Sequence, residues 1–145
     1  MVSIRPVTEV TESLTDAYRV LIPQLSSSSN PPTGEALQRI IESDSAQILI
    51  AEDENGEILG TMTLIIFQIP TGIRAWIEDV VVDSSARGKG IGKKLNFAAL
   101  ELAKQAGAKT VDLTSRPARQ EANQLYRSIG FAERETNVYR FSFEQ

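Results

Sequence analysis

The apolar positions of the first half of the chain recur with the spacing of helices. From Thr8 onward they return every three or four residues, which is typical of a buried helix face. They are Leu14, Tyr18, Leu21, Ile22 and Leu25. Thr33 can cap a second helix, because its side-chain oxygen can accept from a free amide and the same spacing follows. The apolar positions there are Leu37, Ile40 and Ile41.

Two more helices are predicted in the second half. Residues 92–106 place their apolar side chains on one face, and Gly107 is suited to end that helix. Residues 120–129 form the next expected helix, which is followed by Gly130.

Short β-branched runs predict the strands, and one sequence pair predicts a tight turn. The expected strands cover residues 2–5, 47–52, 58–67, 74–82, 110–114, 131–134 and 139–143. Asn55-Gly56 indicates a hairpin between the second and third of them. The last run, from Tyr139 to Phe143, alternates apolar and polar residues, so we expect it to pair with residues 131–134.

The order of these elements, β-α-α-β-β-β-α-β-α-β-β, predicts an α/β fold with a mixed sheet. Three sequential strands favour an antiparallel meander, and the strand-helix-strand unit after it requires a parallel pair. We therefore expect a mostly antiparallel central sheet with helices on both faces. A length of 145 residues suits one domain, residues 1–145.

Missing residue types narrow the chemistry. The chain contains no histidine and no cysteine, which excludes a Ser-His triad, a cysteine nucleophile and a Cys/His zinc site. Proton transfer must then use carboxylates, tyrosine, lysine, water or the backbone, and we expect no metal. The sequence has neither a run of about 18 apolar residues nor a signal-peptide pattern. We therefore expect a cytoplasmic protein with no membrane partner.

Charge is distributed unevenly along the chain. Residues 1–79 carry 12 acidic and 4 basic side chains, a net charge of −8, and residues 80–145 carry 7 acidic and 11 basic ones, a net charge of +4. One half can attract a cation and the other an anion. A chance split across one folded surface is the alternative. A nucleic-acid-binding protein would be more basic, so nucleic acid is not an expected partner.

A glycine-rich loop between a predicted strand and a predicted helix indicates an anion site. The loop is residues 87–92, with the sequence Arg-Gly-Lys-Gly-Ile-Gly. Backbone N–H groups at a helix start are unpaired, the helix dipole favours negative charge, and glycines let a phosphate approach the backbone. A Walker loop is excluded because Arg87 and Lys94 occupy its first Gly and its Ser/Thr positions. The Rossmann spacing also fails, which leaves Arg-x-x-Gly-x-Gly.

That motif follows Glu78-Asp79-Val80-Val81-Val82-Asp83 and resembles the GCN5-related N-acetyltransferase (GNAT) superfamily. The later stretch Ala122-Asn123-Gln124-Leu125-Tyr126-Arg127-Ser128-Ile129-Gly130-Phe131 looks like the helix of that family, with its Leu-Tyr and following Gly-Phe. The predicted element order is also that of the family. The resemblance covers essentially the whole chain.

The resemblance implies an acetyl-CoA site. In such proteins the strand before the loop splays from its parallel neighbour, and the pantetheine arm pairs with the exposed strand backbone, here that of Val80 and Val82. The loop amides would hold the pyrophosphate, and Asn123 could bond a cofactor amide, although the commonest family position for that Asn is Arg119 here. The implied cofactor-binding residues are Val80, Val82, Arg87, Gly88, Lys89, Gly90, Ile91, Gly92, Lys93, Asn123 and Tyr126.

Two residues are implied as catalytic. Tyr126 matches the family tyrosine near the thioester sulfur, where a phenol can protonate a leaving thiolate. It also has the spacing of a core residue. Glu78 is the candidate general base, or it orients a water that acts as the base; pairing with an arginine is the alternative role.

The resemblance predicts an acetyl-CoA-dependent N-acetyltransferase acting by direct attack of an amine. The expected acceptor is a primary amine of a small molecule, and a homodimer remains an open possibility. A protein or peptide N-acetyltransferase is the alternative enzyme. A non-catalytic acetyl-CoA-binding regulatory module is the alternative from another class.

Overall fold

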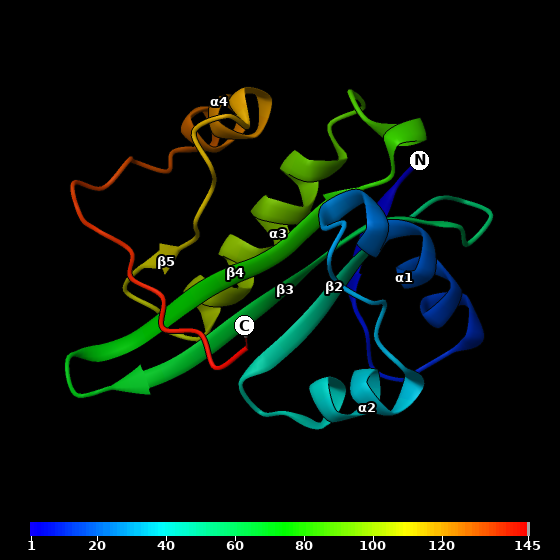
Figure 1. Ribbon diagram of the computed structural model, residues 1–145, viewed down its shortest axis with the longest axis horizontal. Helices are drawn as coiled ribbons and strands as arrows, with labels where there is room; N and C mark the ends of the chain where they lie inside the picture. The colour runs from blue at the N-terminus through cyan, green and yellow to red at the C-terminus, as the bar shows by residue number, and fades with distance from the viewer. Residues whose placement is uncertain (145) are drawn as a thin grey trace. The chain divides into compact units, whose positions relative to one another are not determined.

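Five strands form one sheet in the order β1-β2-β3-β4-β5 (Figure 1). The computed structural model describes residues 1–144. The elements are β1 (Ser3–Pro6), α1 (Glu12–Leu25), α2 (Gly34–Glu42), β2 (Ala46–Glu52), β3 (Ile58–Ile69), β4 (Gly72–Val82), the 3-10 helix η1 (Ser84–Ala86), α3 (Ile91–Gln105), β5 (Val111–Asp112) and α4 (Gln120–Ile129). Neighbouring strands are antiparallel except β4 and β5, which are parallel. The predicted mixed α/β sheet is confirmed.

The chain separates into two compact units. The first comprises Met1–Thr114 and contains the whole sheet with α1, α2 and α3. The second begins at Ser115 and contains α4. No helix in the described part of the chain combines the length and the apolar character needed to cross a bilayer.

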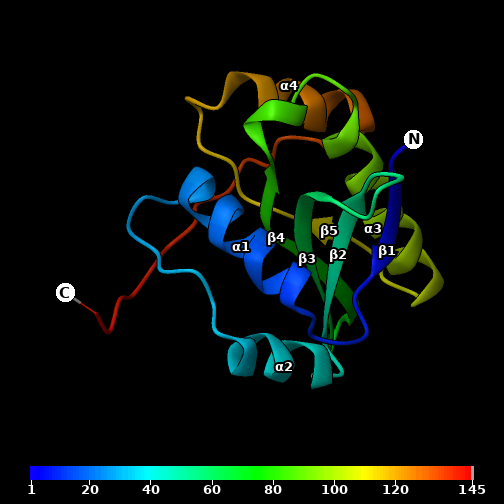
Figure 2. The same cartoon turned by 90° about the vertical axis from the view of Figure 1, so that its right-hand side faces the viewer.

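Helices cover both faces of the sheet in the first unit (Figure 2). Alternate residues of β2 point to opposite faces. Ile48 and Ile50 pack in one cluster with Leu14, Tyr18 and Leu37, which belong to α1 and α2. On the other face, a Cβ placed on Gly60 of β3 would lie 3.4 Å from side chains of α3. The meander therefore separates a face covered by α1 and α2 from a face covered by α3.

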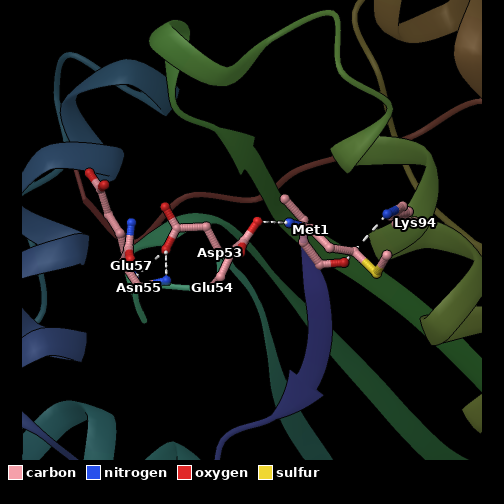
Figure 3. Close-up of polar contacts among 7 residues, drawn as sticks. Met1, Asp53, Glu54, Asn55, Glu57 and Lys94 are labelled. Carbon is pink, nitrogen blue, oxygen red and sulfur yellow. Dashed lines mark hydrogen bonds and ion pairs between the residues drawn. The ribbon is translucent and has the colours of Figure 1, made fainter.

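The hairpin predicted at Asn55-Gly56 is present, and Asp53 organises it (Figure 3). One carboxylate oxygen of Asp53 accepts from the amides of Asn55 and Glu57, each at 2.9 Å. Gly56 has φ of +80°, which a glycine adopts without strain. The N-terminal ammonium of Met1 donates to Glu54 in the same turn at 2.6 Å.

The final strand pair predicted at residues 131–134 and 139–143 is wrong for the described chain, which has no strand after β5. The alternating aromatic side chains of the second segment remain open to solvent. Tyr139, Phe141 and Phe143 are 88%, 83% and 94% exposed. Alternation alone does not make a strand, because each backbone N–H and C=O also needs a partner strand at hydrogen-bonding distance.

The cap predicted for the second helix is formed, and it generates a stability test. The Thr33 hydroxyl accepts from the amide of Ala36 at 3.1 Å. We expect Thr33→Ala to lower the free energy of unfolding by about 1 kcal/mol, because that amide loses its partner. Denaturant unfolding measures this change. Thr8→Ala, at an exposed threonine outside the helices, should change it far less, and equal effects of both variants would exclude a capping role.

Candidate functional site

A β-bulge interrupts β4 near its end. Thr63 of β3 pairs with Glu78 and Thr61 pairs with Val81, so one residue of β3 faces two of β4. One of those two is Asp79, which has φ of +53°, a left-handed conformation that few residues other than glycine adopt. Bulges of this kind re-aim side chains and break the regular ladder of hydrogen bonds.

Beyond the bulge, one edge of β4 is open in the first unit. β5 pairs only with Ala75 and Trp76. The amide of Asp83 donates to Leu59 of β3 at 2.8 Å. Because successive residues turn their backbone groups to opposite edges, the amide and carbonyl of Val82 point away from β3. Val80 lies in the bulge itself.

The glycine loop begins at Arg87, five residues after the end of β4, and leads into α3. Gly88 and Gly90 have φ of +80° and +79°, and a Cβ at either position would meet no atom within 4 Å. The first hydrogen bond of α3 runs from Lys94 N to Gly90 O. The preceding amides, including that of the buried Ile91, are therefore without intrahelical partners. Open space, unpaired N–H groups and a helix N-terminus together can bind an anion.

Only part of the predicted positive charge faces this loop. Arg87 and Lys89 are exposed, and Arg87 Nε donates to the carbonyl of Val82 at 3.1 Å. The Lys93 ammonium lies 5.9 Å from the centre of the Phe97 ring, one turn along α3. Lys94 reaches the carbonyl of Val2 instead, at 3.4 Å (Figure 3). Arg87 and Lys89 are thus the side chains best placed to neutralise an anion.

A glutamine of α1 holds the segment that precedes the loop, and no sequence pattern indicated it. The Oε1 atom of Gln24 accepts from Ser84 N at 2.8 Å. Its Nε2 atom donates to the carbonyl of Val20 at 3.1 Å and lies 3.4 Å from Asp83 Oδ1. Because Ser84 is about 60 residues away in sequence, no local spacing could reveal the contact.

Glu78 lies on the α1 side of the sheet and is paired with an indole. The register places Glu78 opposite Thr63 and Trp76 opposite Ile65, on the face to which Ile48 contributes. Trp76 Nε1 donates to Glu78 Oε1 at 2.7 Å. The arginine pairing considered for Glu78 is not found in the described residues, and the tryptophan takes that place.

A buried series of hydrogen bonds lies on the same face. The Thr61 hydroxyl donates to the carbonyl of Leu49 at 2.9 Å. A hydroxyl has one hydrogen, so at the 3.1 Å contact with Tyr18 the phenol must be the donor. Burial raises the pKa of Tyr18, and the charge of Asp79 raises it further.

Asp79, which lies in the bulge, has a carboxyl group with a raised pKa. Burial raises its pKa above the ordinary 3.8, and the adjacent charge of Glu78 raises it further. Two neighbouring carboxylates cannot ionise as easily as one. Asp79 therefore accepts a proton more readily than an ordinary aspartate does. The indole N–H of Trp76 holds the side chain of Glu78 in place.

The second unit presents the remaining predicted residues on α4. Asn123 Nδ2 donates to the carbonyl of Arg116 at 2.9 Å and so holds the loop before the helix. Tyr126 is one turn later on the same face, and its ring packs edge-on against Phe131 with centroids 5.8 Å apart. Burial raises the pKa of Tyr126, and the charge of Arg119 lowers it. The phenol therefore remains protonated and can donate a proton.

Comparison with known proteins agrees with these features. The chain matches the acetyltransferase (GNAT) family over residues 8–131. It is 37% identical over 97 residues to a probable glucosamine 6-phosphate N-acetyltransferase 2 of Oryza sativa subsp. japonica. That match covers 63% of this chain and 57% of the relative, so the chain spans little more than half of the rice protein.

Two solved structures have the same fold. The glucosamine-6-phosphate N-acetyltransferase of Arabidopsis thaliana superposes with a TM-score of 0.78 at 26% identity, covering 97% of this chain and 98% of that one. An aminoglycoside acetyltransferase from an uncultured soil metagenomic sample, in complex with trehalose, gives a TM-score of 0.84 at 22% identity. It covers 99% of this chain and 97% of its own, and at this identity the likeness shows the fold alone.

The raised pKa of Asp79 generates a pH prediction. The folded carboxyl holds its proton above the ordinary pKa of 3.8, so its ionisation destabilises the fold as pH rises through the raised value. Asparagine also tolerates the left-handed backbone but carries no charge. We expect Asp79→Asn to match the wild type near pH 3 and to be more stable near pH 7.

Unfolding across that pH range measures the difference. Asp112→Asn, at an exposed aspartate of β5, is the matched control. Parallel pH curves for the wild type and Asp79→Asn would show that the Asp79 carboxyl does not contribute to the pH dependence.

Proposed function

Because the chain belongs to the acetyltransferase (GNAT) family, we propose that it is an acetyl-CoA-dependent N-acetyltransferase that acts on a primary amine of a small molecule. The observation that carries the proposal is the anion cradle at the end of an open strand edge. Gly88 and Gly90 leave room there, and the first amides of α3 are free. A molecule with a pyrophosphate and an amide-bearing arm matches both features.

The residues of the first unit fit this cofactor. The loop amides from Arg87 to Lys93 would take the pyrophosphate, with the charges of Arg87 and Lys89 beside it. The outward backbone groups of Val82, and those of Val80 in the bulge, would pair with the pantetheine arm. Arg87 Nε donates a hydrogen bond to the carbonyl of Val82 in the free protein. On binding, the guanidinium would leave this carbonyl and bond to a phosphate instead.

Acetyl-CoA supplies the acetyl group as a thioester, and the chain supplies proton transfer and positioning. The amine nitrogen must lose a proton before it attacks the acetyl carbon, and the C–S bond then breaks. We assign the proton to the carboxylate pair of the bulge, directly or through water. Asp79 has the raised pKa, and Trp76 holds Glu78 in one orientation. A pKa closer to neutral makes a carboxylate the more effective base.

Tyr126 is the proposed proton donor to the leaving thiolate. Its raised pKa keeps the phenol protonated, which that role requires. Asn123 and Tyr126 share a face of α4, so a cofactor contact by Asn123 remains part of the proposal, in addition to its bond to Arg116.

The proposed acceptor is a small, positively charged amine. The first half of the chain carries the net charge of −8, and it contributes the Trp76–Glu78 pair and Asp79. An acidic face raises the local concentration of a cation. The rice and Arabidopsis relatives are described as acting on an amino-sugar phosphate, and the metagenomic structure as an aminoglycoside acetyltransferase. All of these acceptors carry amines on sugar rings, and the charge argument favours those without a phosphate.

Cofactor binding is testable at Gly90. We expect Gly90→Leu to weaken CoA binding by about tenfold or more, because the side chain would occupy the cradle. Gly56→Leu is a matched control, since Gly56 has φ of +80° and equally open surroundings in a distant turn. Both variants should lose about 1–2 kcal/mol of stability from left-handed strain. Titration calorimetry with CoA separates them, and equal CoA affinities would refute the loop assignment.

Catalysis is testable at Tyr126 with a thiol-release assay. The acceptors are polyamines, amino acids, aminoglycosides and amino-sugar phosphates, assayed at low and moderate salt. We expect cationic acceptors to be preferred at low salt, and Tyr126→Phe to lower kcat by about 10²-fold with little change in the KM for acetyl-CoA. Release of CoA with none of them would contradict the enzyme assignment. A preference for the sugar phosphate would contradict the charge argument alone.

A further inference from the structure

We infer that Gln24 couples the glycine loop to the acceptor side of the sheet, so that cofactor binding orders the end of α1. The inference rests on the proposed function, because it assigns the loop to CoA. Gln24 is a positioning residue in this role. It acts through Ser84 and the backbone that follows, and it touches neither reacting group.

The amide of Gln24 uses both its ends to join two distant segments. Its oxygen accepts from Ser84 N at 2.8 Å, and its nitrogen lies 3.4 Å from Asp83 Oδ1. The same nitrogen also donates to Val20 O, one turn back in α1, at 3.1 Å. The side chain is thus tied to its own helix and to the start of η1 at once.

The segment that Gln24 holds leads directly into the cradle. Ser84 begins η1, where the first amides have no partner within the helix. Gln24 caps one of them from outside, while Asp83 caps Ser85 N at 3.3 Å. Ala86 ends η1 as a buried residue, and Arg87 follows it. A change in the loop is therefore transmitted to the glutamine through three residues.

The last turn of α1 lacks one backbone hydrogen bond, which gives the contact from Gln24 more weight, although Ser26 N still donates to Ile22 O at 2.9 Å. Pro23 lies inside α1 and has no amide to donate to the preceding turn. Gln24 is the next residue, and α1 ends at Leu25. In Figure 2 this end of α1 is directed toward the segment after β4. A loop fixed by its ligand would fix Gln24 and, with it, this final turn.

That turn belongs to the acceptor side. α1 covers the sheet face that carries the Trp76–Glu78 pair, and Tyr18 of the same helix is bonded to Thr61. Residues 26–33 continue from α1 to α2. Ordering this turn and connection after CoA binds would shape the acceptor face.

Hydrogen exchange with and without CoA tests the coupling at the amides of residues 24–30. In the wild type we expect CoA to slow their exchange about fivefold. In Gln24→Met, which keeps the length of the side chain but has neither polar atom, CoA should leave their exchange unchanged at saturation. The CoA affinity should also fall about fivefold, as for the loss of one hydrogen bond. Gln24→Ala repeats the test if the methionine variant is poorly folded.

Gln38→Met is the matched control, because Gln38 is an exposed helical glutamine whose amide donates to Glu42 of the same helix at 2.8 Å. It should keep the wild-type response. CoA-dependent slowing retained in both Gln24 variants, or CoA binding to the wild type without slowing at residues 24–30, would overturn the inference. A wild type that fails to bind CoA would instead overturn the proposed function.

Discussion

Backbone groups at the end of β4 that have no partner strand in the first unit are the constraint on which the rest of that unit depends. Buried N–H and C=O groups need partners, and a strand normally finds them on both sides. β4 has β5 beside it only at Ala75 and Trp76, and then bulges at Asp79. The chain continues into two left-handed glycines and a helix whose first amides are free. This arrangement is the reason for proposing that a ligand, rather than another strand, pairs with this stretch.

The two faces of the sheet beside this stretch differ in composition. The α3 face is mostly apolar and tightly packed, with Leu49, Met62 and Leu95 fully buried and Asn96 as the buried polar residue of α3. It anchors the helix whose N-terminus forms the cradle. The opposite face carries the Tyr18–Thr61 bond and the Trp76–Glu78 pair, so polar chemistry gathers there. Because successive side chains of a strand point to opposite faces, neighbouring residues of one strand contribute to the packed face and to the polar face.

Several features of β4 cost stability, which is usual where function rather than packing decides the sequence. Asp79 combines a left-handed backbone with a carboxyl group beside a second carboxylate. Its ionisation is disfavoured by burial and by Glu78, and these same causes make it a better proton acceptor. The indole of Trp76 relieves part of the repulsion by bonding to Glu78.

Local patterns predicted most of the elements, and the glycine pattern led to the proposal of an anion cradle. The spacing of apolar residues predicted α1, α2, α3 and five strands to within a few residues, and it placed α4 at its observed bounds. Gly88 and Gly90 indicated the anion loop because only glycine adopts that backbone freely. These signals are readable because they depend on neighbours in sequence.

Contacts between distant segments were decided only by the tertiary structure. No periodic pattern in the sequence indicated three of these features. They are the bond between Gln24 and Ser84, the bulge at Asp79 and the bond between Trp76 and Glu78. The alternation at Tyr139 and Phe141 suggested a strand that the described chain does not form. The conformational preference of a residue can be predicted from the sequence. Its hydrogen-bond partner and its pKa depend on which surfaces the fold brings beside it.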